Sequence, residues 1–218
     1  MSDIGRQAIL DFRLRDDATF SNYVGDAGKN LQLTAGMAFI WGDAGSGKSH
    51  LLQAFCHAEP SSIFLSDLPT LDASILRGLE SFKLICIDDV DQVIANNIWQ
   101  EALFHLINDC LSSKSHLVLS AASPAAKLDC HLRDLQTRLN GIVGIETDRL
   151  SDRQRLEALK LKASSHGFDF SDEVGHFILA RAGRDMHSLI AIFEKLNHET
   201  LRAQRKVTIP FVKQVLDL

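Results

Sequence analysis

One eight-residue segment limits the possible folds of this chain more than any other. Residues 42–49 match the pattern G-x-x-x-x-G-K-[ST] at every fixed position. The apolar run Met37–Trp41 precedes them and the helix-like run His50–Ala58 follows, which is the strand–loop–helix context that the pattern requires. Glycines let successive backbone N–H groups curl around phosphate oxygens, and a helix start adds its positive end. The segment therefore predicts a phosphate-binding loop, with an ordinary glycine-rich turn as the weaker alternative.

Two side chains at the end of this loop have predicted roles of their own. We expect the Lys48 ammonium to pair with the β- and γ-phosphates of a nucleotide, and the Ser49 hydroxyl to ligate Mg²⁺. The other contacts are expected from the loop backbone and from the first turn of the following helix. The residues predicted to contact the cofactor here are Gly42, Asp43, Ala44, Gly45, Ser46, Gly47, Lys48, Ser49 and His50.

Two carboxylates follow a second apolar run. Asp88 and Asp89 come directly after Leu84-Ile-Cys-Ile, which places them at the carboxyl edge of a buried strand, where ligands bind in open α/β sheets. Next to a phosphate loop this is the Walker B arrangement. We expect Asp88 to hold Mg²⁺ through water and Asp89 to orient or deprotonate the attacking water. The alternative is a pair of aspartates that only caps the next helix.

Short apolar runs alternate with helix-like segments through the first 150 residues. Unbroken runs of four to six apolar residues fit strands that are covered on both faces, so the alternation predicts an α/β fold with an open parallel sheet. The predicted strands are Met37–Trp41, Ser62–Ser66, Leu84–Asp88, Leu117–Ala121 and Gly141–Ile145. The predicted helices are His50–Ala58, Leu71–Leu79, Ile98–Leu111 and Leu132–Leu139.

The pattern changes after Leu150, where no strand-like run appears. Ser151 and Gln154 form a capping box ahead of a helix that ends near Gly167, and helices are also predicted at 171–182, 185–203 and from Thr208 onward. Residues 1–150 hold 12 basic and 19 acidic side chains, whereas 151–218 hold 11 and 9. We therefore predict a tail over residues 1–15, an α/β domain over 16–149 and a small all-helical domain over 150–218.

Composition excludes several classes of protein. The formal net charge is −5, which argues against holding nucleic acid by bulk charge. No apolar run reaches the roughly 18–20 residues of a membrane span, and the first ten residues lack a secretory core. We expect a soluble cytoplasmic protein without a large basic surface. The cysteines lack C-x-x-C spacing and are predicted to be small buried residues, not disulfide or zinc ligands: Cys56, Cys86, Cys110 and Cys130.

Three segments together resemble the DnaA/Hda family of AAA+ proteins: Thr19–Tyr23, the phosphate loop and Ile87–Asp89. The resemblance extends from about Asp16 to Leu218 and implies an AAA+ P-loop NTPase core with an open parallel sheet, followed by a helical lid. The initiator DnaA continues into a helix-turn-helix DNA-binding domain that does not follow here. This layout and the ending at 203–213 are similar to the Hda branch of the family.

The resemblance implies a function. Members of the Hda branch act with the DNA-loaded sliding clamp to promote hydrolysis of ATP bound to DnaA, which prevents re-initiation. The implied partners are therefore DnaA and the sliding clamp. AAA+ relatives also assemble side by side, so homo-oligomers are compatible with the resemblance, whereas strong direct DNA binding and membrane binding are not expected.

The same resemblance implies roles for four residues. Phe20 and Tyr23 match the N-terminal segment that packs near the nucleotide base, with simple core anchoring as the alternative. Arg138 matches the arginine finger, which reaches into a neighbour's site and stabilises charge on the transferring phosphate; its alternative is a solvated arginine at a helix end. Arg184 matches the sensor-2 arginine, which reaches from the lid to the phosphates.

One position departs from the family pattern. The strand at 117–121 is followed by alanines where the family has a polar sensor-1 side chain, so Ser120 and Ser123 are the only polar candidates. The missing amide or carboxylate weakens positioning of the attacking water. We therefore expect weak or absent intrinsic ATPase activity. The working cofactors that we expect are Mg²⁺ and an adenine nucleotide, ADP before ATP; because a phosphate loop recognises phosphates, the sequence leaves ATP and other bases open as alternatives.

The tail carries one further motif. Gln7, Leu10 and Phe12 have the form Q-x-x-L-x-F of sliding-clamp-binding peptides, in which an amide makes hydrogen bonds while two apolar side chains fill a groove. Three fixed positions are a weak signal alone, and an ordinary tail is the alternative. Within a chain that resembles the Hda branch, the motif predicts clamp binding.

Two other functions are compatible with part of the pattern. A self-contained AAA+ ATPase, such as a helicase loader or DNA-remodelling factor, needs rapid intrinsic turnover, and the sensor-1 position argues against that. A DNA-binding initiator needs a basic reading surface. The net charge and the modest cluster of Arg202, Arg205 and Lys206 argue against direct sequence readout.

Overall fold

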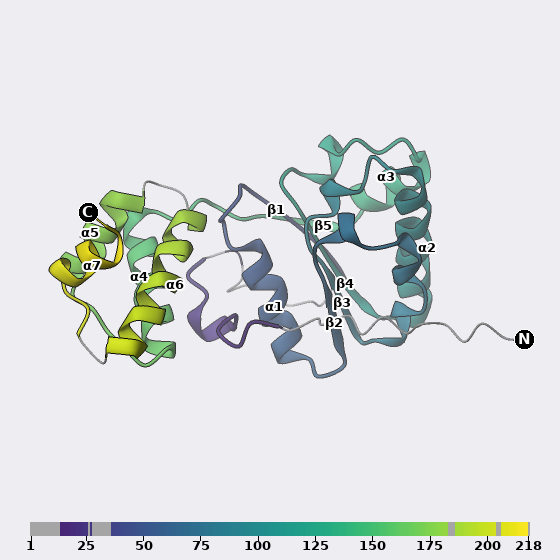
Figure 1. Cartoon of the computed structure of the whole chain (residues 1–218). Coiled ribbons are helices and arrows are strands. Elements are labelled where there is room, and N and C mark those ends of the chain that lie inside the picture. The colour runs from purple at the N-terminus through teal and green to yellow at the C-terminus, as the bar shows by residue number, and fades with distance from the viewer. Residues whose placement is uncertain (1–13, 26, 28–35, 183–185, 204–205, 218) are drawn as a thin grey trace, which may run out of the picture.

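The five apolar runs form one parallel sheet with the strand order β2-β3-β4-β1-β5. Figure 1 shows the computed structural model, which describes residues 14–25, 27, 36–182, 186–203 and 206–217. The prediction of an α/β fold with an open parallel sheet is confirmed. The strands are β1 (Met37–Trp41), β2 (Ser62–Leu65), β3 (Leu84–Ile87), β4 (His116–Ala121) and β5 (Val143–Glu146).

Helices cover both faces of this sheet (Figure 1). Alternate residues of a strand point to opposite faces. Ala38 and Ile40 of β1 therefore pack with α1 (Lys48–Ala58) on one face, while Phe39 packs on the other with α2 (Asn97–Ser113) and α3 (Arg133–Asn140). The residues of β1 are buried except for the half-buried Trp41, which explains why a strand covered on both faces reads as a continuous apolar run.

Two predicted elements differ from the structure. Leu71–Leu79 is not an α-helix but a chain of short 3₁₀ turns, Ala73–Leu76 and Leu79–Ser81. Gly78, with φ 81°, interrupts the segment, because a helical path cannot continue through a left-handed residue. The last strand was expected to be covered on both faces, yet Val143 in β5 is 53% exposed because β5 is an edge strand that pairs with β1 alone.

Four helices follow β5: α4 (Asp152–Ser165), α5 (Asp172–Ala182), α6 (Met186–Ala203) and α7 (Ile209–Val215). The predicted capping box begins α4, where the Gln154 N–H donates to Ser151 Oγ and the Ser151 N–H donates to Gln154 Oε1. The four helices share an apolar cluster of their own around Phe193. Among the described residues, no helix is long and apolar enough to cross a membrane.

Candidate functional site

The loop between β1 and α1 is approached closely from two sides. Gly45 and Gly47 have φ of 77° and 93°, conformations that side chains disfavour. A Cβ atom at Gly45 would lie 2.7 Å from Met186 Cβ of α6, and one at Gly47 would lie 3.0 Å from the Tyr23 ring. Both glycines are therefore required by the backbone path and by the segments packed on the loop.

The side chain of Lys48 is buried inside the loop between β1 and α1. Lys48 is 7% exposed, and its Nζ donates to the carbonyl oxygens of Gly42, at 2.8 Å, and Asp43, at 3.1 Å. Ser46 is also buried and shares a 2.7 Å hydroxyl–hydroxyl bond with Thr147, which follows β5. A buried ammonium whose partners among the described residues are two backbone carbonyls, beside the N-terminus of α1, is suited to an anionic ligand.

A serine of the neighbouring strand holds the segment at the end of β3 that carries the two predicted carboxylates, through the Asp88 side chain and the Asp89 backbone. The Ser120 hydroxyl donates to Asp88 Oδ1, and the Asp89 N–H donates to Ser120 Oγ at 2.9 Å. Ser120 is fully buried and Asp88 is 5% exposed. Ser120, one of the two polar sensor-1 candidates, is thus engaged with the carboxylates, and the side chain that lines the adjoining cavity is Ala122.

A cavity of about 370 Å³ lies in front of these groups. Its base consists of the phosphate loop and the carboxyl edge of the sheet, with Asp89, Asp91 and Gln92. Oδ1 of Asp91 is buried and has no hydrogen-bond partner among the described residues. The remaining walls come from the N-terminal segment and from the four-helix part. The lining side chains of those walls are Arg15, Asp17, Asn22, Tyr23, Val24, Leu150, Ala158, Leu159, Lys162, Met186 and Ile190.

The N-terminal segment 14–24, called the strap below, lies against α1. Tyr23 lines the cavity and its ring lies 5.5 Å from the His50 ring, whereas Phe20 packs edge-to-face on Phe55 at 5.0 Å and does not line the cavity. The His50 Nε2–H donates to the Thr19 carbonyl at 2.9 Å. Burial lowers the pKa of His50, which keeps the ring neutral.

The structure brings only some of the predicted site residues together. The loop residues 44–50, Tyr23 and Asp89 line one cavity, with Asp88 directly behind it. Arg138 lies on α3, exposed, and has no ion pair among the described residues. The predicted sensor-2 residue Arg184 and the tail residues lie outside the described residues; the latter are Gln7, Leu10 and Phe12.

Sequence reasoning missed four charged residues that line the cavity, namely Arg15, Asp17, Asp91 and Lys162. The charged stretch at 15–17 lies just before Thr19–Tyr23, the segment that carries the family resemblance. Its position could therefore have indicated that these side chains lie near the nucleotide site. Lys162 lies one turn beyond Ala158 and Leu159, which also line the cavity. Nothing local in the sequence links Asp17 to a lysine 145 residues away.

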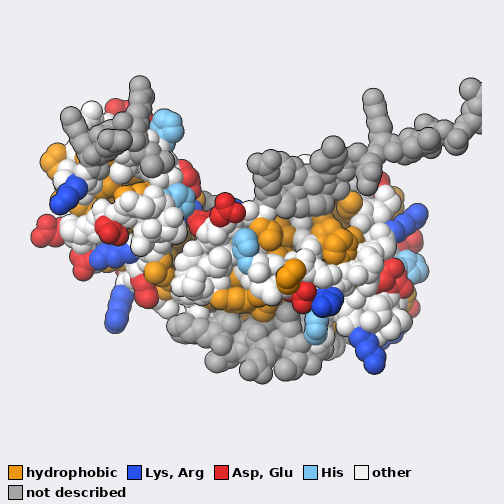
Figure 2. Space-filling view, turned by 90° about the horizontal axis from the view of Figure 1, so that it is seen from below, with side chains coloured by type: hydrophobic (Ala, Val, Ile, Leu, Met, Phe, Trp, Pro, Cys, Tyr) orange, Lys and Arg blue, Asp and Glu red, His pale blue; other side chains and the backbone are white. Residues whose placement is uncertain are grey.

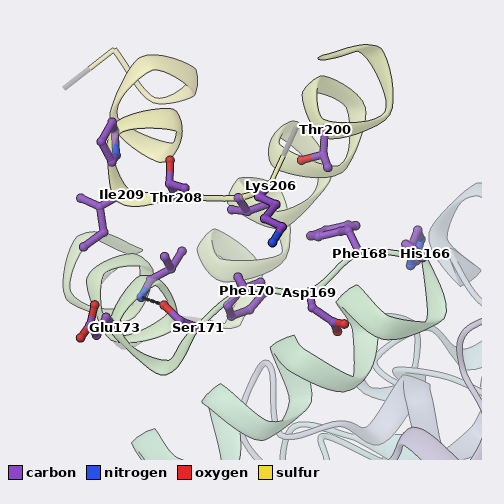
Figure 3. Close-up of a pocket in the computed structure, with 14 residues that line it drawn as sticks. His166, Phe168, Asp169, Phe170, Ser171, Glu173, Thr200, Lys206, Thr208 and Ile209 are labelled. Atoms are coloured by element: carbon purple, nitrogen blue, oxygen red, sulfur yellow. Dashed lines mark hydrogen bonds between the residues drawn. The ribbon is translucent and has the colours of Figure 1, made fainter. Parts of the chain in front are cut away.

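A larger cavity, of about 1090 Å³, lies within the four-helix part, between the α4–α5 loop and the segment before α7. Figure 3 shows Lys206 extending across it toward Phe170 and Asp169. This cavity contains none of the predicted site residues. Among the described residues, no group of three His, Cys, Asp or Glu side chains is placed to hold a metal ion anywhere. The smaller cavity is therefore the candidate site.

The surface charge is dispersed where it is visible. On the face shown in Figure 2, the Lys and Arg side chains lie apart from one another and acidic side chains lie between them. A backbone-binding surface for nucleic acid instead gathers cations along one stripe. This face therefore does not present such a stripe.

Comparisons with known proteins agree with this architecture. The family model described as "Hda, lid domain" matches residues 152–216. An uncharacterised protein from Haemophilus influenzae is 36% identical over 233 residues, which cover 99% of this chain and all of that protein.

Solved structures show a similar fold. Domain III of the replication initiation protein DnaA from Thermotoga maritima superposes with a TM-score of 0.76 at 22% identity, covering 94% of this chain and 98% of that one. DnaA bound to AMPPCP, from Aquifex aeolicus, gives 0.60 at 22% identity, covering 78% and 58%. The RuvB branch-migration motor of Thermotoga maritima gives 0.62 at 17% identity, covering 83% and 61%.

Proposed function

Because this chain belongs to the Hda/DnaA-related family of AAA+ proteins, we propose that it binds an adenine nucleotide and regulates replication initiation through DnaA. The observation that carries the proposal is the 370 Å³ cavity. It is enclosed by a phosphate loop on one side and by the Hda-type lid on the other. A relative of the same fold is a DnaA bound to AMPPCP, an adenine nucleotide analogue.

The chain's own residues fit such a nucleotide. Lys48 would exchange two loop carbonyls for phosphate oxygens, and the N–H groups of residues 44–49 would surround them. Ser49 and Asp88 would hold Mg²⁺, directly and through water, and the ion would neutralise phosphate charge. Tyr23 and the apolar side chains of the lid wall would contact the base. ADP as the working ligand remains part of the proposal.

We expect intrinsic hydrolysis to be slow. Asp89 lies at the cavity, where it would orient a water. The family's polar sensor-1 side chain is expected within residues 121–123, and of these three the residue that lines the cavity is Ala122, which offers only a methyl group. Ser120 has both its donor and its acceptor engaged by the carboxylate segment. Without the family's sensor-1 amide or carboxylate to fix the water, we expect the bound nucleotide to act as a structural switch and not to be hydrolysed rapidly.

The proposed action on DnaA uses a different surface. Arg138 projects from α3 into solvent with no ionic partner among the described residues, and its exposure suits a guanidinium that acts in a neighbouring molecule. There it would stabilise charge on the γ-phosphate of DnaA-bound ATP. Gln7, Leu10 and Phe12 would bind the sliding clamp and bring the protein to DNA-loaded clamps.

The test is an assay of ATP hydrolysis by DnaA, with and without DNA-loaded clamp. We expect this protein to stimulate hydrolysis only when clamp is present, and Arg138→Ala to abolish stimulation while nucleotide and clamp binding persist. Arg133→Ala, an exposed arginine on the same helix, is the matched control. Full stimulation by Arg138→Ala would refute the trans-acting finger.

Two further measurements separate the alternatives. Alanine at Gln7, Leu10 and Phe12 together should abolish capture of the protein by immobilised clamp, and unchanged capture would remove the tail from the proposal. The proposed regulator is expected to hydrolyse ATP slowly by itself, whereas a self-contained AAA+ ATPase needs rapid turnover. Rapid ATP turnover by the isolated protein would therefore favour the self-contained ATPase.

A further inference from the structure

The strap is fixed to the helix that begins at the phosphate-binding lysine. The Arg15 N–H donates to Gln53 Oε1 at 2.8 Å, and the His57 Nε2–H donates to the Arg15 carbonyl at 2.9 Å. One turn nearer the loop, His50 donates to the Thr19 carbonyl at 2.9 Å. Three side chains of α1 thus satisfy backbone groups of the strap, so the strap and α1 form one unit.

The same strap is joined to the lid by a charge pair. Lys162 Nζ of α4 donates to Asp17 Oδ2, and each of the two side chains is 13% exposed. Lys162 also pairs with Glu194 of α6 at 3.2 Å and lies 5.2 Å from the centre of the Phe193 ring. These contacts fix Lys162 within the lid. Its bond to Asp17 connects the lid to the strap.

Both members of this pair line the nucleotide cavity. Ala158 and Leu159, on the same helix as Lys162, form part of its apolar wall. A movement of α4 away from the strap would carry that wall away from the phosphate loop.

We propose that Asp17 and Lys162 form a latch that holds the lid over the nucleotide site, so that both act as positioning residues for nucleotide binding. The proposal rests on the proposed function, because it assigns a role in nucleotide binding to residues of the same cavity. The latch transmits the position of α4 through the strap to α1 and its phosphate loop. The affinity for nucleotide depends on the latch although neither side chain is expected to touch phosphate.

The surroundings of Asp17 distinguish this pair from an ordinary surface salt bridge, which contributes little. Burial raises the pKa of Asp17, but hydrogen bonds and charge from Arg15 and Lys162 outweigh that effect and hold the pKa well below its usual range. The Arg15 Nε–Asp17 Oδ1 distance is 3.1 Å. The carboxylate is therefore ionised throughout the physiological range, and removing Lys162 takes away one of the two cations that compensate this shielded charge.

The experiment measures the dissociation constant of a fluorescent ADP analogue for the full chain and four variants. We expect Asp17→Asn and Lys162→Gln each to weaken binding about tenfold, and the double variant to bind no more weakly than either single, because the two residues act as one unit. Glu194→Gln removes the other partner of Lys162, within the lid, and should leave the affinity within about twofold. Circular dichroism establishes that each variant is folded.

A second readout follows the lid itself. Hydrogen exchange of the α4 amides should be faster in Asp17→Asn and Lys162→Gln, with exchange of the α1 amides unchanged. Lys160→Gln breaks an exposed pair between Lys160, on the same helix as Lys162, and Asp172 of α5, and should not change α4 exchange. Lys162→Arg keeps the positive charge and should therefore retain both the nucleotide affinity and the protection of the α4 amides. If the lysine had a purely steric role, the arginine variant would lose both.

The possible failures are distinct. Wild-type affinity in both single variants, or losses that multiply in the double variant, would overturn the latch. If the wild-type chain binds no nucleotide, then the proposed function fails instead. The latch is then still tested by the exchange of α4 in the nucleotide-free chain, where equal exchange in wild type and variants would overturn it.

Discussion

Ser120 provides the sharpest test of how the candidate site is built. The family resemblance marks it as a candidate to position water, whereas the structure engages it in holding the Asp88–Asp89 segment. Its hydroxyl donates to the carboxylate of Asp88 and accepts from the Asp89 N–H. The substitution Ser120→Ala removes both bonds and leaves a methyl group in a fully buried position.

The expected magnitude follows from these two bonds. A hydrogen bond to a charged group contributes about 1.5–3 kcal/mol, and the loss of an acceptor for a partly buried N–H costs about 1 kcal/mol more. We therefore expect the free energy of unfolding to fall by about 3 kcal/mol. For a chain of this size that corresponds to a decrease in Tm of about 6–12 °C.

Differential scanning calorimetry measures this change directly. Ser123→Ala is the matched control, because Ser123 is the other sensor-1 candidate, is partly exposed and makes no hydrogen bond among the described residues. Its Tm should stay within about 1 °C of the wild type, as expected for a surface substitution. A loss below about 1 kcal/mol for Ser120→Ala, or equal losses for both serines, would refute the reasoning that Ser120 fixes the carboxylates.

Two further predictions concern the phosphate loop and the strap. Gly47→Ala should destabilise the chain by about 1–2 kcal/mol, because the φ of Gly47 is positive. It should also weaken nucleotide binding, because the new methyl group meets the Tyr23 ring. Gly78→Ala, with φ 81° and no atom within 4 Å, should show only the loss of stability, and equal nucleotide affinities would count against the loop contact. The second prediction is a dependence of stability on pH: since burial lowers the pKa of His50, the unfolded chain binds the extra proton, and stability falls as the pH drops below about 6.5. The groups around its ring are the Thr19 carbonyl, Tyr23, Arg15, Asp17 and Lys162. Thermal unfolding from pH 5.5 to 7.5 should show a smaller slope for His50→Gln but not for the exposed His105→Gln, and identical slopes for wild type and His50→Gln would contradict the assignment.

Much of the fold could be predicted because its determinants are local. A strand covered on both faces must be apolar at every position, so β1 and β3 are visible as unbroken runs. The capping box at Ser151 is visible for the same reason, since both of its bonds lie within four residues. Position in the sheet is not local. Val143 reads like a buried strand residue, and only the strand order reveals that β5 is an edge.

The candidate site divides in the same way. The phosphate loop and the Asp88–Asp89 pair follow directly from a motif and its context. The role of Ser120 did not follow, because a hydroxyl at the end of a strand has several possible partners and the sequence does not choose among them. The Asp17–Lys162 pair was hidden more completely, since each residue taken alone looks like a solvated charge and only the folded chain brings them together.

The polar face of α1 shows how such a link can be anticipated in retrospect. His50, Gln53 and His57 are spaced by three and four residues, so they share one face of the helix, opposite the apolar face that packs on the sheet. Considered singly, the two histidines suggest metal ligands, and a solvent-facing stripe would be the ordinary alternative. Their actual partners are the backbone groups of the strap. A helix that must be buried on two sides needs side chains able to satisfy a neighbouring backbone. This requirement, not catalysis, accounts for the polar stripe beside Lys48.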